Sequence, residues 1–196
     1  MTTPPDTPTP NDTPTPPGTP APPDTPTPND TPAPPVALTP NDVVPPLDVL
    51  APVTGRTVPL SAVDDPVFAT GLVGPGVALV PRPGRESVAV APVDGTLATV
   101  HPHGFVVRAD DGRSVLVHLG IDTVELRGEG FVVHRSRGDV VNRGDAVVSW
   151  DPAAVEAGGR SAVCPVVALE AAADALAGLH PDGSDLTTSD TLFVWS

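Results

Sequence analysis

Three of the five histidines in the chain lie close together, at His101, His103 and His118. His118 belongs to a run, residues 114–119, in which residues expected on a buried face alternate with residues expected on the opposite face, as in a β-strand. Gly120 follows, and a glycine there exposes backbone amide groups. A histidine in this position can act as a nucleophile or as a metal ligand. The alternative is a histidine on the solvent face of a strand.

The β runs at residues 104–109 and 114–119 are separated by Asp110-Asp-Gly-Arg113, a sequence typical of a hairpin turn. In such a hairpin, His103 falls nearly opposite His118, within the reach of a cross-strand pair. Two facing imidazoles leave three functions open. One ring attacks a phosphoryl group while the other positions and stabilises it, or both rings bind a metal ion, or the two form a surface pair without a role.

The composition of the chain limits its partners. The formal net charge of −14 over 196 residues argues against binding to nucleic acid or to anionic lipid. The single cysteine, Cys164, cannot form an internal disulfide, and its apolar surroundings predict a buried thiol. No stretch reaches the roughly 18 apolar residues of a membrane span, and the N-terminus lacks the features of a signal peptide. We therefore expect a soluble cytoplasmic protein without direct membrane insertion.

Two regions of different composition divide the chain. Residues 1–46 contain 18 of the 29 prolines and no arginine, and the sequence Pro4–Pro14 recurs at Pro22–Pro32. Such a segment cannot bury enough apolar surface to offset chain entropy, so we predict a disordered Pro/Thr/Asp-rich tail. From residue 47 to residue 196, short apolar runs alternate with turn sequences, which predicts one folded domain.

The pattern of this domain predicts an all-β fold, an antiparallel β-sandwich or partly open barrel with one or two short helices. Asp151 and Pro152 predict the start of one helix, and the alanine-rich segment Glu170–Leu179 predicts a second. The predicted strands are Val49–Ala51, Gly55–Pro59, Val77–Pro81, Ser87–Val90, Gly95–Val100, Gly104–Ala109, Ser114–Leu119, Phe131–His134, Ala146–Ser149 and Leu192–Trp195.

The segment His118–Phe131, which reads His-Leu-Gly-Ile-Asp-Thr-Val-Glu-Leu-Arg-Gly-Glu-Gly-Phe, resembles a known signature. It is similar to the phosphorylation site of glucose-type IIA domains of the bacterial phosphoenolpyruvate:sugar phosphotransferase system. Four further blocks resemble the same family in the family's order, namely Ala51–Gly55, Asp65–Ala69, Val90–Gly95 and Gly138–Asp145.

The resemblance implies a phosphocarrier. His118 is implied to accept a phosphoryl group from phospho-HPr and to pass it to a cysteine on a IIB domain. His103, followed by Gly104 and Phe105 as in the family, is implied to donate a hydrogen bond to the phosphoryl oxygens. No segment resembles the IIB phosphocysteine motif or the IIC permease, so the IIB domain is expected on a separate IIBC permease.

Other residues of the resemblance are expected to support this site. Gly120 and Thr123 are expected to position His118, with backbone amides around Gly120 fixing its second ring nitrogen or cradling the anion. Asp65 and Asp122 match acidic positions that flank the family's site and meet basic groups on HPr. A solvated loop carboxylate is the alternative for Asp65.

The predicted docking rim for partner proteins consists of Val67, Phe68 and Val73, with a place in the buried core as the alternative. If Phe68 is exposed, it is expected to anchor an interface. His101 departs from the family pattern, since it occupies a position where the family often has a threonine that hydrogen-bonds within the site. This departure puts the fine positioning of His103 in question and favours metal binding.

Phosphoryl transfer requires no cofactor, but alternative functions involve one. In a regulatory binding module, His103 and His118 would bind zinc together with a carboxylate from a partner, such as a regulated transporter or enzyme. A zinc hydrolase is suggested by two motifs, His101-x-His103 and His118-x-x-x-Asp122, whose spacings resemble those of LytM-type metallopeptidases, although those enzymes carry the two motifs in the opposite order. A biotinyl or lipoyl carrier is excluded, because the chain contains no lysine.

Overall fold

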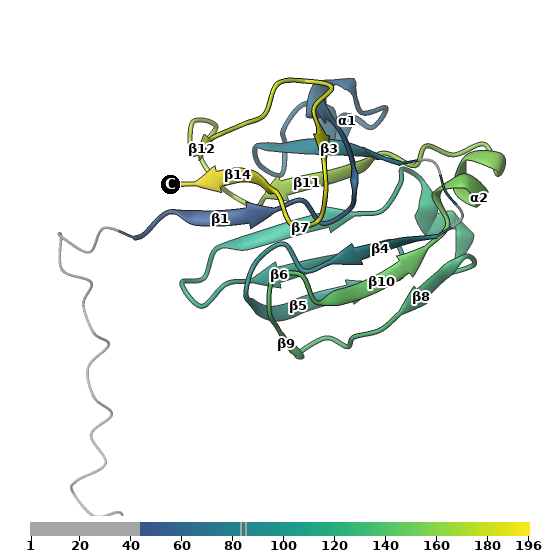
Figure 1. Cartoon of the computed structure of the whole chain (residues 1–196), viewed down its shortest axis with the longest axis horizontal. Helices are drawn as coiled ribbons and strands as arrows, with labels where there is room; N and C mark the ends of the chain where they lie inside the picture. The colour runs from purple at the N-terminus through teal and green to yellow at the C-terminus, as the bar shows by residue number, and fades with distance from the viewer. Residues whose placement is uncertain (1–43, 83, 85) are drawn as a thin grey trace, which may run out of the picture. The chain divides into compact units, whose positions relative to one another are not determined.

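The structure, a computed structural model, describes residues 44–82, 84 and 86–196. All but the last three residues of the predicted tail, residues 1–46, therefore lie outside the described residues. The described chain consists mainly of antiparallel β-strands with two short α-helices (Figure 1). None of the helices in this part of the chain is long and apolar enough to cross a membrane.

The largest sheet carries eight strands, and every neighbouring pair in it is antiparallel. In spatial order these strands are β13 (Asp185–Leu186), β2 (Gly55–Pro59), β3 (Gly76–Pro81), β11 (Cys164–Ala168), β7 (Ser114–His118), β6 (Gly104–Arg108), β5 (Gly95–His101) and β9 (Val140–Val141).

Two three-stranded sheets complete the fold. One has the order β4 (Ser87–Val90), β10 (Ala146–Trp150), β8 (Phe131–Val133), and the other has the order β1 (Leu47–Leu50), β14 (Thr191–Trp195), β12 (Leu176–Ala177). Residues of all three sheets meet in one core, among them the fully buried side chains of Val49, Leu97, Trp150 and Phe193. The predicted all-β sandwich is confirmed, and the sheets do not close into a barrel.

A smaller apolar cluster lies on the other face of the large sheet, beneath helix α1 (Pro66–Ala69). It contains Phe68 from α1, Ala78 from β3, Val167 from β11 and Ile121 from the loop after β7. This second cluster holds α1 and the loop after β7 against the same face of the sheet. It thereby brings two segments that are far apart in sequence to the end of β7.

Alternation along β7 follows the sequence prediction. Val115 and Val117 are fully buried, whereas Ser114, Leu116 and His118 lie on the opposite, partly exposed face.

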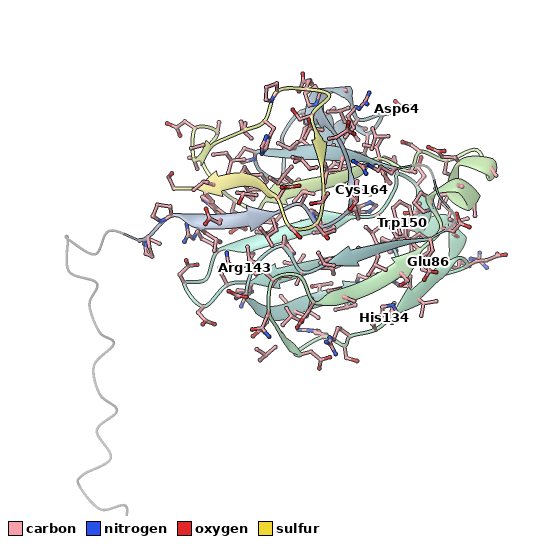
Figure 2. The ribbon with its side chains drawn as sticks, viewed as in Figure 1. Asp64, Glu86, His134, Arg143, Trp150 and Cys164 are labelled. Atoms are coloured by element: carbon pink, nitrogen blue, oxygen red, sulfur yellow. The ribbon has the colours of Figure 1, made fainter. Side chains whose placement is uncertain are left out.

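Strand β11 was not predicted, because all of its residues are buried and no alternation is visible in such a run. It includes Cys164, whose predicted burial is confirmed (Figure 2).

The helices agree with the sequence in one place and differ in another. Asp151 caps helix α2 (Pro152–Ala157), its carboxylate accepting a hydrogen bond from the Ala154 amide at 3.0 Å, as predicted. The predicted helix over Glu170–Leu179 is wrong. Glu170 has a left-handed backbone with φ of 60°, and the segment continues in turns to β12, which pairs with β14. Strand pairing therefore overrides the helix propensity of alanine there.

Candidate phosphoryl-transfer site

The hairpin of β6 and β7 brings two histidines together. Gly104 lies opposite His118 in this hairpin, and the His103 carbonyl accepts a hydrogen bond from the Leu119 amide at 2.7 Å. His103 is therefore next to His118 across the strands, as the turn sequence predicted. The two ring centroids are 5.4 Å apart and the ring planes differ by 51°.

The two rings belong to a row of four. Phe68 contacts His118 from the other side, with centroids 5.4 Å apart, and His101 stacks on His103 at 5.5 Å with nearly parallel planes. His118 is thus held between a buried phenyl ring and a second imidazole. His101 does not contact His118 directly, and its place in the row is that of a support for His103.

The Gly120 carbonyl fixes the orientation of His118. The Nδ1 atom of His118 lies 2.6 Å from the Gly120 carbonyl oxygen. Because a carbonyl can only accept, Nδ1 must carry the proton and donate it. In the neutral ring the lone pair then lies on Nε2, the nitrogen that can act as a nucleophile. The prediction that backbone amide N–H groups of this turn fix the second nitrogen is wrong, since Nδ1 contacts a carbonyl oxygen. That these N–H groups cradle the anion stays a prediction.

The turn after β7 is built around glycine. Gly120 has φ of 77°, and a Cβ atom there would lie 2.6 Å from Cγ2 of Thr123 and 2.8 Å from the Ser161 carbonyl oxygen. Thr123 is buried and its hydroxyl donates to the Leu119 carbonyl at 2.7 Å. Both residues therefore position the carbonyl that holds His118.

We expect Gly120→Ala to lower the free energy of unfolding by about 2–4 kcal/mol, because a left-handed backbone and two close contacts both oppose a side chain. Urea denaturation measures this loss. Gly138→Ala is the matched control, since Gly138 has φ of 93° and open space around it, so only the backbone cost of about 1–2 kcal/mol remains. Equal losses in the two variants would show that packing at Gly120 is unimportant.

The two predicted acidic residues flank the site in different ways. Asp65 caps α1, and one of its carboxylate oxygens accepts a hydrogen bond from the Val67 amide at 2.7 Å. Asp122 is exposed, has φ of 58° and makes no side-chain hydrogen bond at the start of the following 3-10 turn. Asp122 is thus free to meet a partner, whereas Asp65 also has a structural task.

The predicted apolar rim divides between surface and core. Val67 is 41% exposed and Val73 is half-buried, but Phe68 is only 6% exposed. Phe68 therefore packs behind His118 instead of offering an exposed anchor. The sequence prediction omitted Val124, which is 58% exposed on the 3-10 turn next to Asp122. Its position directly after Thr123 in the signature could have identified it.

Burial dominates the electrostatics of both rings. Burial lowers the pKa of His118 below its usual value, although the Gly120 carbonyl and the carboxylates of Asp65 and Asp122 oppose this shift. Burial also lowers the pKa of His103, and the neighbouring rings of His118 and His101 add to the effect. Both rings are therefore neutral at pH 7. Among the residues that the structure describes, no group of three or more side chains could hold a metal ion.

Comparison with known proteins identifies the family. Residues 47–173 match the family described as phosphoenolpyruvate-dependent sugar phosphotransferase system, EIIA 1. The chain belongs to this family. Membership gives it a phosphocarrier role in sugar transport, and the signature and blocks recognised in the sequence are thereby explained.

Individual EIIA proteins support this assignment. The glucose-specific EIIA component of Oceanobacillus iheyensis is 41% identical over 120 residues, which are 60% of this chain and 71% of that protein. The solved glucose permease IIA from Mycoplasma capricolum has a TM-score of 0.69 and 31% identity, covering 77% of this chain and 96% of the other.

Some relatives are larger EIIBCA proteins, of which the part matching this chain is only a fraction. The glucose-specific EIIBCA component of Corynebacterium glutamicum is 38% identical over 142 residues, and the matching part is 71% of this chain and 21% of that protein. The mannose-specific EIIBCA component of the same organism is 41% identical over 125 residues, 63% of this chain and 18% of that protein. This EIIA chain therefore spans about a fifth of the length of such relatives. The presence of an EIIB part in the same proteins supports a IIB partner for this chain.

If His118 is the phosphoryl acceptor, as the resemblance implies, its lowered pKa predicts the pH dependence of phosphoryl acceptance. A free histidine is half protonated near pH 6.5, and only the neutral ring has a lone pair on Nε2. Because the folded pKa is lower, we expect the midpoint of the loss of acceptance on acidification to lie below pH 6.5. Single-turnover rates with a phosphorylated donor across this range measure the midpoint.

The same shift sets the sign of the stability change. The unfolded chain binds protons at His103 and His118 that the folded chain does not, so stability is fully present above pH 6.5 and decreases as the pH falls below it. For the rate of phosphoryl acceptance, a midpoint above pH 6.5 would contradict a neutral, buried nucleophile.

Proposed function

We propose that this chain is a cytoplasmic phosphocarrier that takes a phosphoryl group from phospho-HPr onto Nε2 of His118. It passes the group to a cysteine on the IIB domain of a separate IIBC permease. The observation that carries the proposal is the 2.6 Å bond between Nδ1 of His118 and the Gly120 carbonyl, which leaves Nε2 as the free nucleophile. No metal ion or cofactor is needed for this step.

The transfer balances without an external acid or base. The Nε2 lone pair attacks phosphorus, the Nε2–P bond forms, and the bond between phosphorus and the donor's histidine breaks with its electron pair returning to that histidine. The proton on Nδ1 stays in its bond to Gly120 throughout. In the second step the thiolate of the IIB cysteine attacks phosphorus and the Nε2–P bond breaks. The task of the protein is therefore alignment and charge stabilisation.

His103 is the residue that stabilises the phosphoryl group in this proposal. Its ring centroid is 5.4 Å from that of His118, close enough for its side chain to contact a group bound to that ring. A neutral His103 donates one N–H to a phosphoryl oxygen, and the charge of a bound phosphoryl group favours a second proton on the ring. Asp122, Val67 and Val124 are exposed around the site and serve as contacts for the partner proteins.

The direct test is the intact mass of the chain after incubation with Enzyme I, HPr and phosphoenolpyruvate. We expect one phosphoryl adduct that is lost in acid, as a phosphohistidine is. Omitting HPr should prevent the adduct, and adding the IIB domain should remove it from the chain. The absence of any adduct with active HPr would overturn the proposal.

A second candidate is a regulatory module in which His103 and His118 bind zinc with a partner's carboxylate. It is favoured by the adjacency of two neutral imidazoles, which are good zinc ligands. Tetrahedral zinc takes four ligands, and the described residues offer no third protein ligand there. The partner would have to supply the rest, so zinc affinity measured by calorimetry should be weak for the chain alone. Tight zinc binding by the isolated chain would contradict this arrangement.

A further inference from the structure

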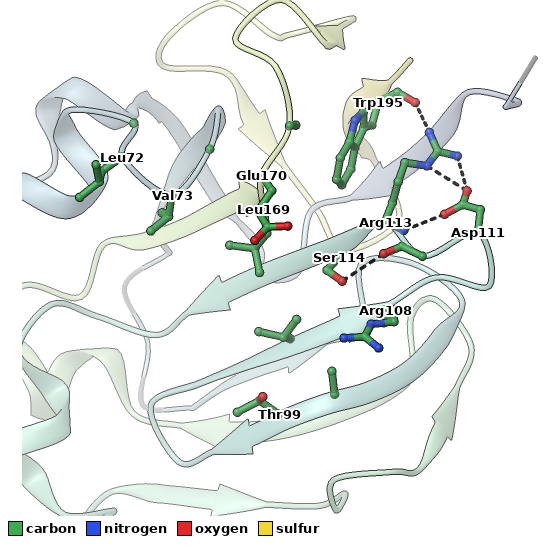
Figure 3. Close-up of a pocket in the computed structure, with 16 residues that line it drawn as sticks. Leu72, Val73, Thr99, Arg108, Asp111, Arg113, Ser114, Leu169, Glu170 and Trp195 are labelled. Atoms are coloured by element: carbon green, nitrogen blue, oxygen red, sulfur yellow. Dashed lines mark hydrogen bonds and ion pairs between the residues drawn. The ribbon is translucent and has the colours of Figure 1, made fainter.

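A groove of about 950 Å³ lies on the same face of the large sheet as His118. It lies over strands β5, β6 and β7, and the loop at residues 71–74 and the segment 169–171 line it on the side away from β5 (Figure 3). Ser114 lines the groove and shares its face of β7 with His118. The groove and the nucleophile therefore open on the same side of the large sheet.

The strand register gives the separation between them. Arg108, which lines the groove, lies opposite Ser114, whereas Gly104 lies opposite His118 at the other end of the same hairpin. Four residues of β-strand span about 13 Å. A partner domain that covers His118 with an interface of ordinary size, about 800 Å² on each side, also reaches Arg108.

The groove holds two charges of opposite sign without partners. Arg108 and Glu170 both project into it, and neither makes a hydrogen bond or ion pair through its side chain with any residue in the described ranges (Figure 3). The neighbouring pair differs, because Arg113 contacts Asp111 at 2.6 Å and donates to the Trp195 carbonyl at 2.6 Å. Arg113 is therefore part of the framework, whereas Arg108 is available to a partner.

Rigid elements keep the two free charges apart. Arg108 belongs to β6, between β5 and β7. Glu170 follows β11 with φ of 60°, and its amide donates to the Val73 carbonyl at 3.1 Å. Leu72, which is 77% exposed, adds an apolar contact at the rim of the groove. An occupant of this groove meets a cationic wall, an anionic wall and an apolar edge at fixed positions.

We propose that the groove docks a segment of the IIB domain, which places a carboxylate on Arg108 and a basic side chain on Glu170. The inference rests on the proposed function, in which a IIB domain must approach His118. Exposed complementary charges contribute more to specificity and association rate than to affinity. The rest of the chain is strongly acidic. The unpaired Arg108 therefore favours IIB domains that carry an acidic residue at the position facing it.

The test titrates the isolated cognate IIB domain into the unphosphorylated chain by calorimetry or NMR. We expect Arg108→Gln and Glu170→Gln each to weaken binding about fivefold, and Arg108→Glu to weaken it about tenfold or more. The dependence of binding on salt should decrease in each glutamine variant. Arg137→Gln is the matched control, because Arg137 is exposed, does not line the groove and should bind as the wild type does.

Phosphorylation by phospho-HPr separates this proposal from the proposed function. The Arg108 variants should accept the phosphoryl group at the wild-type rate, with only the KM for the IIB domain raised. If Arg108→Glu bound the IIB domain as tightly as the wild type does, the groove would not be the docking site. Equal losses of activity with phospho-HPr and with the IIB domain would also contradict the proposal. A wild-type chain that binds IIB through Arg108 but takes no phosphoryl group would overturn the proposed function alone.

Discussion

His118→Ala is expected to abolish phosphorylation by phospho-HPr, with no adduct detectable by intact mass at times that fully modify the wild type. The substitution removes the nucleophilic Nε2 atom. His118 is held in place by the bond from its Nδ1 atom to the Gly120 carbonyl, and its ring neighbours are Phe68 and His103. His103 lacks that orientation, so it does not replace the missing nucleophile. Circular dichroism and urea denaturation check that the fold remains, with a loss of about 1 kcal/mol for the missing hydrogen bond.

A second histidine variant serves as the control for this experiment. His134 directly follows β8, which belongs to a different sheet from β7, and its Nε2 atom is 2.8 Å from the Ser149 hydroxyl. His134→Ala should therefore accept the phosphoryl group at the wild-type rate and reach the same final mass. An acid-labile adduct on the His118→Ala protein would transfer the role of acceptor to another residue and end the present assignment.

The sequence predicted the hairpin that forms the site because its information is local. The turn Asp110–Arg113 and the alternation in β7 together determine which residues face each other, and the pairing places His103 beside His118. Strand β11 carries no such information, since a strand buried on both faces has a continuous apolar sequence. Its place between β3 and β7 is set by long-range pairing alone.

The polarity of the bond to His118 could not be predicted either. The sequence indicated that Gly120 shapes the turn, but whether a carbonyl or an amide points at the ring depends on backbone torsions, here a φ of 77°. The burial of Phe68 had a similar cause. Its neighbours in the second cluster, among them Ala78 and Val167, come from strands far along the chain. Local patterns predicted the reactive residues, and tertiary contacts determined how each is oriented.

His103→Gln is expected to leave the final level of phosphorylation intact and to slow transfer from His118 to the IIB domain about 100-fold. The nucleophile and its bond to Gly120 remain, so the adduct still accumulates over minutes. The variant keeps a neutral N–H donor, but it cannot take up a proton when the phosphoryl group brings negative charge to the site. Charge on the phosphoryl oxygens is then less stabilised in the transition state. Rapid-quench measurement of single-turnover transfer gives the rate.

Variants of the neighbouring residue distinguish chemistry from packing in this experiment. His101→Gln makes the same change one position further along the row of rings, where the side chain contacts His103 but not His118. We expect it to slow transfer by about two- to 13-fold, well short of the effect of His103→Gln, because stacked rings of this kind contribute about 0.5–1.5 kcal/mol. If both variants slowed transfer equally, His103 would act only by packing. Wild-type transfer by His103→Gln would remove it from the site altogether, since a residue that stabilises the moving phosphoryl group must affect the rate at which that group leaves.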